Sequence, residues 1–363
     1  MEEIDREGTE PEAPPEWENR PVPRWLRVLV LVVVIVIVPL LLLDRVRIGG
    51  WVLTAPGGTL DIEPYVEVQG TPTFPTDEQI RLVTVRSNLE PSVLELIGGW
   101  LDGAIRVQDR EDVLGSRTVE ENRTLGMHQM AQSLDIASRV ALERLGYDVI
   151  TEAGALVMEV AEGTPADGVV SRGDVIIEAA GQEVVNSTAL VGVIQGMRPG
   201  DPLTFTVLEA DGATRTVDVV LGDRDGTAFL GVSIGTYVDL IDLPFEIDID
   251  VGQIGGPSAG LALTLSVLDL LTEGQLTGGL DVVATGTMDP LGFVGPIGGI
   301  EQKSHSVLRD GADLFLVPLG DVEAAKAVIG DRIPVVGVAT LDEALDALAA
   351  RGGDITGVLR AAG

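Results

Sequence analysis

The segment that most constrains the fold of this chain is the turn at residues 255–260, which reads Gly-Gly-Pro-Ser-Ala-Gly. It follows an alternating stretch at 245–251 that predicts a strand, and it precedes an apolar run at 261–271 that predicts a helix. Glycine permits a tight turn, and Pro257 suits the first turn of a helix. The sequence therefore places the hydroxyl of Ser258 at a helix N-terminus, where backbone N–H groups can stabilise an oxyanion.

Lysine is scarce in this chain, and its placement is informative. Of the 24 lysines and arginines, only Lys303 and Lys326 are lysines. A buried amine can lose its proton whereas a guanidinium cannot, so a required lysine indicates proton chemistry. Lys303 ends the run Pro-Ile-Gly-Gly-Ile-Glu-Gln-Lys and could serve as the general base for Ser258. Lys326 has Glu323 and Asp331 nearby and is interpreted as a surface charge.

These two motifs, with the pair Thr285-Gly286 between them, resemble the Ser–Lys proteolytic domain of Lon proteases over about residues 242–348. The resemblance places Ser258 on the family's nucleophile and Lys303 on its general base. It places Thr285 on a threonine that helps to hold the lysine. What it implies is a serine endopeptidase that needs no metal and no other cofactor.

The same turn also satisfies Gly-x-Ser-x-Gly, the nucleophile pattern of α/β-hydrolases. That fold requires an acid and a later histidine, so its triad would combine Ser258, either Asp281 or Asp289, and His305. His305 lies two residues from Lys303, and side chains two apart on a helix point in different directions, so both cannot serve one serine. A third interpretation is that Ser258 is only a helix cap.

The N-terminal region predicts a membrane anchor. Residues 1–24 are acidic and rich in proline, which is typical of a disordered tail. Residues 25–43 are the predicted anchor, in which the run from Val28 to Leu43 is apolar without a break. This run is close to the roughly 20 residues that span a bilayer, and longer than the about 7–15 of a signal peptide, which is the alternative. Three arginines lie at its start and two follow it, which favours a cytoplasmic N-terminus and a body outside the cell membrane.

Residues 44–148 predict a membrane-proximal α/β region, in which we recognise no chemistry. Its clearest elements are a strand at 82–85 and a helix at 124–145, whose apolar residues recur at helical spacing. His128 lies on this helix and is interpreted as a surface residue. We expect the region to position the domains that follow.

Residues 149–222 predict a small β domain. Its strands are expected at 156–160, 173–178, 203–208 and 215–221, with a helix at 187–195. This order, with Gly-Thr-Pro-Ala and Arg-Gly-Asp-Val-Ile in place, resembles a bacterial PDZ domain. The resemblance implies capture of an extended peptide by strand addition at Gly154, Ala155, Leu156 and Val157, beside the strand that starts near Leu156. The alternative is a PDZ fold used as a spacer or an intramolecular contact.

Residues 223–363 complete the chain as an α/β proteolytic domain, with a loose tail expected after Gly352. The fold class is thus α/β (α+β) and multidomain, and the whole resembles the membrane-anchored PDZ–Lon serine proteases of bacterial envelopes. Neither lysine follows a glycine, so the sequence contains no Gly-Lys-Ser/Thr motif and therefore no P-loop. The enzyme is expected to need no nucleotide. The alternative is a scaffold protein of the envelope whose protease domain is inactive.

Composition limits the partners. A net charge of −33 argues against nucleic acid as a partner, since phosphate binding needs clustered cations. The expected partners are protein or peptide substrates and the membrane. The chain has no cysteine, which rules out disulfides and thiol catalysis but does not locate the protein. Assembly into a homo-oligomer is expected only by analogy with the family.

Overall fold

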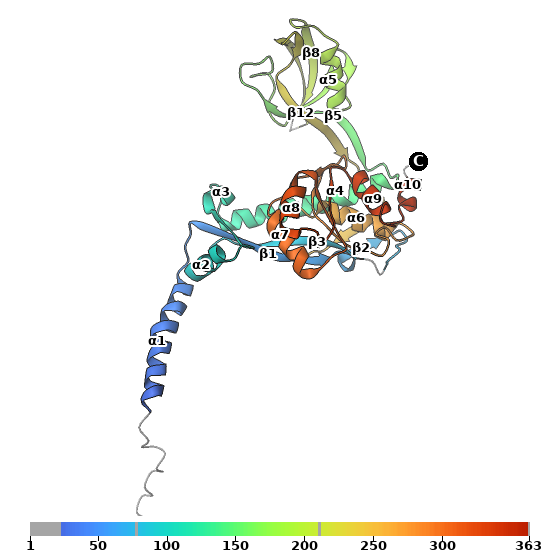
Figure 1. The fold of residues 1–363 in the computed structure, drawn as a ribbon. Coiled ribbons are helices and arrows are strands. Elements are labelled where there is room, and N and C mark those ends of the chain that lie inside the picture. Colours follow the sequence, from blue (N-terminus) through green and yellow to red (C-terminus); the bar gives the residue numbers. More distant parts are fainter. Residues whose placement is uncertain (1–22, 77–78, 210–211, 362–363) are drawn as a thin grey trace, which may run out of the picture. The chain divides into compact units, whose positions relative to one another are not determined.

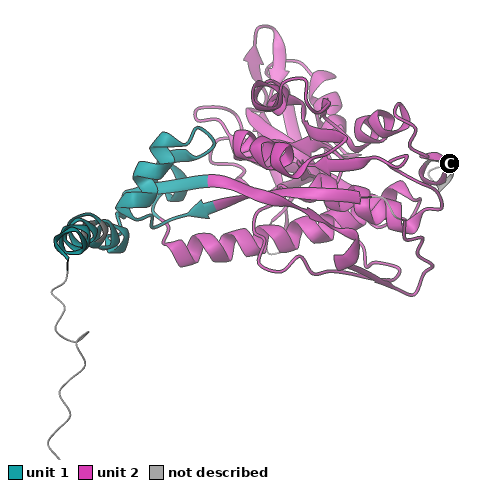
Figure 2. Ribbon diagram, turned by 60° about the horizontal axis from the view of Figure 1, so that its bottom comes forward, with its two compact units in different colours: residues 1–54, 87–116 teal, residues 55–86, 117–363 magenta. Residues whose placement is uncertain are grey.

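The computed structural model describes residues 23–76, 79–209 and 212–361, so the predicted acidic tail lies outside the described residues up to residue 22. The chain divides into two compact units (Figure 2). The first contains residues 1–54 and 87–116, and the second contains residues 55–86 and 117–363. Strands β1 (Trp51–Asp61) and β3 (Gln79–Asn88) contribute residues to both units.

The first unit contains helix α1 (Arg24–Arg45), which is apolar, exposed and long enough to cross a membrane. A signal sequence near an N-terminus meets the same criteria of length and composition. It continues with α2 (Val93–Leu101), β4 (Arg106–Asp109) and α3 (Arg110–Leu114). Helix α2 begins at a capping box, in which Ser92 and Glu95 satisfy each other's backbone N–H groups. Trp51 packs edge-to-face on Trp100.

The second unit is built on a sheet in which β18 (Val335–Val338), β17 (Leu314–Pro318), β14 (Asp281–Ala284) and β3 run parallel, followed by β1 (Figure 1). Alternate residues of these strands join two different clusters. Leu314 and Leu316 pack with α4 (Val119–Arg144), α6 (Gly260–Leu271) and α9 (Leu341–Ala349). Phe315 and Val317 pack with α7 (Ile300–Asp310) and α8 (Val322–Ile329). Helices therefore cover both faces, as buried parallel strands require.

Helix α6 is buried all round, because its residues from Gly260 to Leu270 are each less than a tenth exposed. A helix that is apolar on every face belongs in a core, and this one lies between the sheet and α4. Small elements complete this part of the unit: η1 (Glu63–Tyr65), β2 (Val66–Gln69), β13 (Glu246–Ile249), β15 (Thr287–Met288), β16 (Val294–Gly295) and η2 (Leu319–Asp321). Strand β13 pairs with β2, and β15 pairs with β16.

An inserted β domain, which we define as residues 149–240, interrupts this architecture between α4 and β13. Its sheet has the order β12-β5-β6-β8-β9, and β7 pairs with β6. The elements are β5 (Ile150–Val160), β6 (Val175–Ala179), β7 (Gln182–Glu183), α5 (Ser187–Gln195), β8 (Pro202–Leu208), β9 (Thr214–Val220), β10 (Gly222–Arg224), β11 (Thr227–Phe229) and β12 (Val232–Leu240). It has a hydrophobic core of its own, to which Leu190 and Phe205 belong.

The structure differs from the sequence-based division in two places. Part of the predicted membrane-proximal region 44–148 shares a sheet with the C-terminal domain, because Val282 of β14 pairs with Ile80 of β3 inside one parallel sheet. The predicted boundary after residue 222 falls too early, because Leu230 and Ile234 pack on the core of the inserted β domain. In both cases the partner strands are distant in sequence, so local patterns could not reveal the pairing.

The expectation of a loose tail after Gly352 is wrong. Residues from Thr356 to Ala361 form helix α10, and Val358 is fully buried in the main core. The amide of Asp354 donates to the carbonyl of Gln275 at 2.8 Å, which fastens the segment to the loop after α6. The helix has six residues, which is too short for a periodicity test.

Candidate active site

The turn at residues 255–260, which we call the serine turn, is held from outside by helix α4. The amide of Gly256 donates to the carbonyl of Gly126 at 2.8 Å, and the hydroxyl of Ser133 donates to the carbonyl of Pro257 at 3.2 Å. Gly256 has φ +95°, a conformation that favours glycine. A Cβ on Gly260 would lie 2.7 Å from the amide nitrogen of Met288, so only glycine fits there. These contacts fix the backbone on both sides of Ser258.

Lys303 comes to Ser258 from α7, on the first turn of that helix. Its side chain is only 2% exposed, and its Nζ lies 2.7 Å from Ser258 Oγ. The structure therefore brings together the serine and the lysine that the sequence singled out, with no residue between the two polar atoms.

Thr285 follows directly after β14 and completes the polar cluster. It is fully buried, and its hydroxyl donates to the carbonyl of Ser258 at 3.0 Å. Lys303 Nζ donates to the same hydroxyl at 2.9 Å. The amide of Gly286 also donates to the carbonyl of Ser258, at 2.9 Å. The site thus lies at the carboxyl end of a parallel strand, where α/β proteins commonly place their chemistry.

Burial lowers the pKa of Lys303 from 10.5 to about 7, and the carboxylate of Asp321 opposes this shift in part. The cause is physical, since a buried ammonium loses its hydration and the neutral amine is favoured. At neutral pH a large fraction of this amine can therefore accept a proton. A perturbed lysine beside a hydroxyl is the combination expected of an activated nucleophile.

A cavity of about 460 Å³ opens beside Ser258. It is lined by the serine turn, by Met130 of α4, and by segments 57–60 of β1 and 82–86 of β3. The sequence did not predict these lining residues or the contacts of Gly126 and Ser133. Gly126 offers a signal, because a glycine inside a helix costs stability unless another backbone approaches closely.

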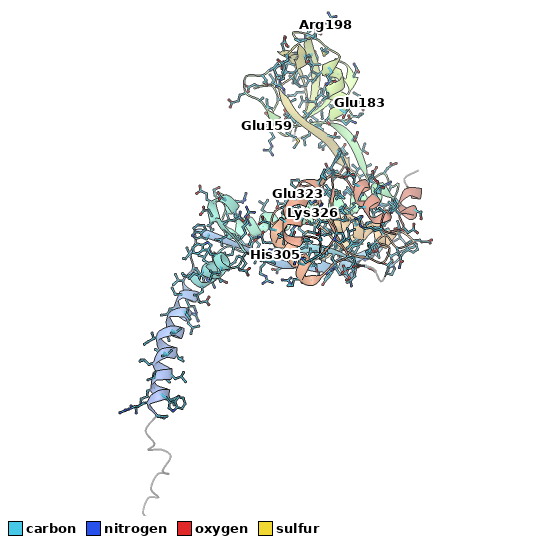
Figure 3. All side chains as sticks on the ribbon, in the orientation of Figure 1. Glu159, Glu183, Arg198, His305, Glu323 and Lys326 are labelled. Carbon is cyan, nitrogen blue, oxygen red and sulfur yellow. The ribbon has the colours of Figure 1, made fainter. Side chains whose placement is uncertain are left out.

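The α/β-hydrolase triad is not assembled. The carboxylate of Asp281 binds the guanidinium of Arg81 at 2.6 and 2.5 Å, and that of Asp289 accepts the amides of Leu291 and Phe293. Within the described residues, the only side-chain hydrogen bond of Ser258 Oγ is to Lys303, and none joins it to His305. His305 is half-buried on α7, and Lys326 is exposed on α8 (Figure 3).

The residues predicted to bind peptide lie on β5, which begins at Ile150 and therefore earlier than expected. Gly154, Ala155, Leu156 and Val157 do not form a free edge. They pair with β6 on one side, through Ala155 and Leu156, and with β12 on the other. The four residues therefore lie inside the sheet, and β12 forms its edge. For metals, no group of three or more histidine or acidic side chains within the described ranges is arranged to hold an ion.

Comparison with known proteins identifies two domains. Residues 247–350 match the family model of the Lon protease (S16) C-terminal proteolytic domain, and residues 113–221 match that of the PDZ domain. Lon protease 2 of Herpetosiphon aurantiacus is 31% identical over 176 residues, 43% of this chain and 21% of that protein. Lon protease of Frankia alni is 26% identical over 311 residues, 80% of this chain and 34% of that protein.

Solved structures include the PDZ domain of the SdrC-like protein from Listeria monocytogenes, with 27% identity, a TM-score of 0.22, and coverage of 23% of this chain and 90% of that one. The chain itself spans about a fifth to a third of the two curated relatives named above.

The match at residues 247–350 indicates a proteolytic domain of the Lon type. The PDZ match covers the inserted β domain up to residue 221, so the chain has the domain content of a PDZ–Lon protease.

Proposed function

We propose that this protein is a serine endopeptidase in which Ser258 and Lys303 form the catalytic dyad. The observation that carries the proposal is the 2.7 Å separation between Lys303 Nζ and Ser258 Oγ, at an amine whose pKa burial lowers to about 7. The Lon-type domain supports the reaction class, and the adjoining cavity supplies room for a peptide. Protein or peptide chains are the proposed substrates.

In the proposed mechanism, neutral Lys303 accepts the proton of Ser258 while Oγ attacks the scissile carbonyl carbon. Thr285 orients the base. Its hydroxyl hydrogen is committed to the carbonyl of Ser258, so it can only accept a hydrogen bond from Lys303. This turns an N–H of the amine toward Thr285 and leaves the nitrogen lone pair for Ser258. The resulting ammonium then protonates the leaving amine, and water hydrolyses the acyl-enzyme by the same steps in reverse.

The oxyanion is proposed to bind backbone amides of the serine turn. Those of Gly256, Gly260 and Leu261 donate to carbonyls at 2.8 to 3.3 Å. In the described part of the chain, the amides of Gly255, Ser258 and Ala259 have no such acceptor. Those of Ser258 and Ala259, at the nucleophile itself, are the proposed donors. Preorganised donors of this kind lower an acyl-transfer barrier by about 3–4 kcal/mol each.

We further propose that the enzyme works without nucleotide and is anchored by α1. The sequence has no P-loop motif, so we infer that it cleaves exposed or flexible segments rather than unfolding its substrates. Helix α1 has the length and apolarity of a single membrane span. The bias of arginines toward its start favours a catalytic body outside the cytoplasm.

The decisive experiment measures peptide cleavage by the purified full chain in detergent, without nucleotide. The comparison is between the wild type, Ser258→Ala, Lys303→Ala and His305→Ala. We expect the first two substitutions to abolish turnover and His305→Ala to leave it within about twofold, since His305 makes no contact with the hydroxyl. Activity that needed His305 and not Lys303 would replace the dyad with a hydrolase triad. A wild type inert on every peptide would favour the scaffold alternative.

A further inference from the structure

Helix α2 presents an apolar face to solvent. Its residues Ile97, Trp100 and Leu101 are 44%, 62% and 83% exposed. They are three and four positions apart, so they lie on one side of the helix. Val93 and Leu94 of the first turn fall on the same side by this spacing and are partly exposed. An exposed apolar stripe of this kind marks a surface that binds something apolar.

The opposite side of α2 attaches the helix to strand β1. Leu96 and Gly99 are buried there. A Cβ on Gly99 would lie 2.9 Å from Cδ2 of Leu53, so the absence of a side chain lets α2 pack closely on β1. Glu95 is the only charged residue of the helix, and its carboxylate pairs with Arg47 at 3.0 Å. A helix that is apolar on most of its surface belongs in apolar surroundings, and β1 supplies them on one side only.

The start of α2 is fastened to the end of α1. The hydroxyl of Ser92 donates to a carboxylate oxygen of Asp44 at 3.1 Å. The amide of Val93 donates to the carbonyl of Val46 at 3.2 Å. Both helices belong to the first unit, and α2 lies at the end of α1 that carries Arg45 (Figure 1). Wherever the end of α1 is held, the first turn of α2 is therefore held beside it.

The end of α1 marks the surface of the membrane that this helix is proposed to span. The helix is apolar without a break from Val28 to Leu43, and the charged residues Asp44 and Arg45 follow. Charged residues at the end of a span lie at the level of the lipid headgroups. The first turn of α2 lies at that level too, because Ser92 contacts Asp44. Trp100 is of a residue type enriched in this zone, where one part of the ring is apolar and the other is hydrated.

We infer that the apolar face of α2 inserts into the headgroup region of the bilayer beside α1, so that the protein binds the membrane through two elements. A helix in this position buries its apolar side about 5–10 Å deep, at the boundary between headgroups and acyl chains. The argument for lipid as the partner is continuity with the span, which the two hydrogen bonds supply. The inference rests on the proposed anchor and is independent of the catalytic dyad. Two attachments would fix the tilt of the first unit at the membrane.

The chain's lack of cysteine allows a direct test, because a single introduced cysteine takes a fluorescent label at one position. The full chain is reconstituted in vesicles of phosphatidylcholine and phosphatidylglycerol, in which part of the lipid carries a nitroxide near the glycerol end of its acyl chain. A nitroxide quenches only labels that lie close to it. Leu101→Cys carries the α2 label, and Leu42→Cys carries the span label, which reports the anchor. Glu323→Cys carries the α8 label, which reports the background at an exposed position (Figure 3 labels Glu323).

We expect the nitroxide lipid to quench both the span label and the α2 label. Quenching of the α2 label should exceed that of the α8 label by roughly threefold or more, since the apolar side of an interfacial helix reaches the acyl chains. Adding Ile97→Asp to the Leu101→Cys chain should lower the quenching of the α2 label by about twofold, because a charge opposes insertion. Ile97 is exposed, so this variant should keep its fold, and a thermal melt verifies that it does.

An α2 label quenched no more than the α8 label, with strong quenching of the span label, would overturn the inference and leave the anchor intact. Quenching of the α2 label that does not respond to Ile97→Asp would also overturn it, because closeness to α1 would then be the only cause. Weak quenching of the span label would overturn the anchor and the inference together. Iodide, a quencher confined to water, is the last comparison. An α2 label shielded from both quenchers would place a protein, such as a second copy of the chain, on this face and refute the lipid contact.

Discussion

The serine turn and strand β5 of the PDZ domain were both singled out from local motifs, but they differ in accessibility. Beside Ser258 the structure leaves a cavity of about 460 Å³. Beside Ala155 there is no open edge, because Thr236 of the edge strand β12 pairs with it. A motif predicts which chemistry a site can perform, but only the tertiary pairing determines whether the site is accessible.

The two sites also differ in their energetics. The serine turn carries a destabilising group, since burial of Lys303 disfavours its charged form. Strand β5 is stabilised by its main-chain pairing with β12 and by the packing of Val232 and Ile234 on the core of the domain. A site that performs chemistry lowers stability, whereas a paired strand inside a sheet adds to it. Four predictions sharpen this contrast, and each could break it.

The largest effect is expected from Lys303→Arg. A guanidinium keeps its proton, so it cannot act as a general base, and peptide cleavage should fall by roughly three to five orders of magnitude. Lys326→Arg is the matched control, because Lys326 is exposed on α8 and should leave the rate unchanged. The measurement is kcat/KM on one short peptide. Substantial activity in Lys303→Arg would refute the general-base role.

The next effect is on stability. The pKa of Lys303 is lowered from 10.5 to about 7, so between these pH values the unfolded state binds more protons than the folded state. The free energy of unfolding therefore rises with pH across that window. Lys303→Met removes this pH dependence. The variant should therefore gain stability over the wild type at pH 6, and the gain should shrink by about 4 kcal/mol by pH 10. Denaturant titrations at both pH values test this. A gain that does not depend on pH would contradict the lowered pKa.

A smaller effect is expected in the pH dependence of cleavage. Below pH 7 the amine of Lys303 is mostly protonated, so kcat/KM should rise about tenfold per pH unit and then level above pH 7. Between pH 5.5 and pH 8 the increase should be about 30-fold. His305→Ala should show the same profile. A rate that falls from pH 6 to pH 8 would exclude the neutral amine as the base.

The smallest effect concerns the contact between α5 and β12. Ser187→Ala removes one hydroxyl contact to Thr236, so the variant should lose about 1 kcal/mol of stability. Thr188→Ala is the control, since Thr188 is the exposed next residue of α5. Denaturant titrations of the two variants give the comparison. Equal stability of the two variants would show that this contact does not hold β12.

The sequence predicted features that depend on local order. Helix α5 has the predicted bounds, and the serine turn lies between a strand and a helix as expected. Ser258 and Lys303 were chosen for their residue type, and the structure brings them together, while their catalytic role stays a prediction. Features that depend on long-range pairing were missed. The placement of β3 beside β14 and of β12 beside β5 joins segments far apart in sequence, which no local pattern encodes.

Helix α4 illustrates a signal that was present but not used. Gly126 stands inside a helix, where glycine is costly, and its carbonyl accepts the amide of Gly256. A Cβ on Gly255 would lie 3.2 Å from the carbonyl carbon of Gly126, so the two backbones are almost in contact. The helix was predicted as a generic element, and its role in holding the serine turn follows only from the tertiary structure.

The pairing of the first and last strands of the PDZ domain has a consequence for how such a chain can be rearranged. Ile150 lies opposite Leu240, and the amide of Ile241 donates to the carbonyl of Val149 at 3.0 Å. The chain thus enters and leaves the insertion at points one strand spacing apart, about 5 Å. A two-residue turn between residues 149 and 241 would bridge that gap, so the PDZ domain could be replaced by a short turn. Recombination could add, delete or exchange it without altering the order of the strands that carry Ser258 and Lys303.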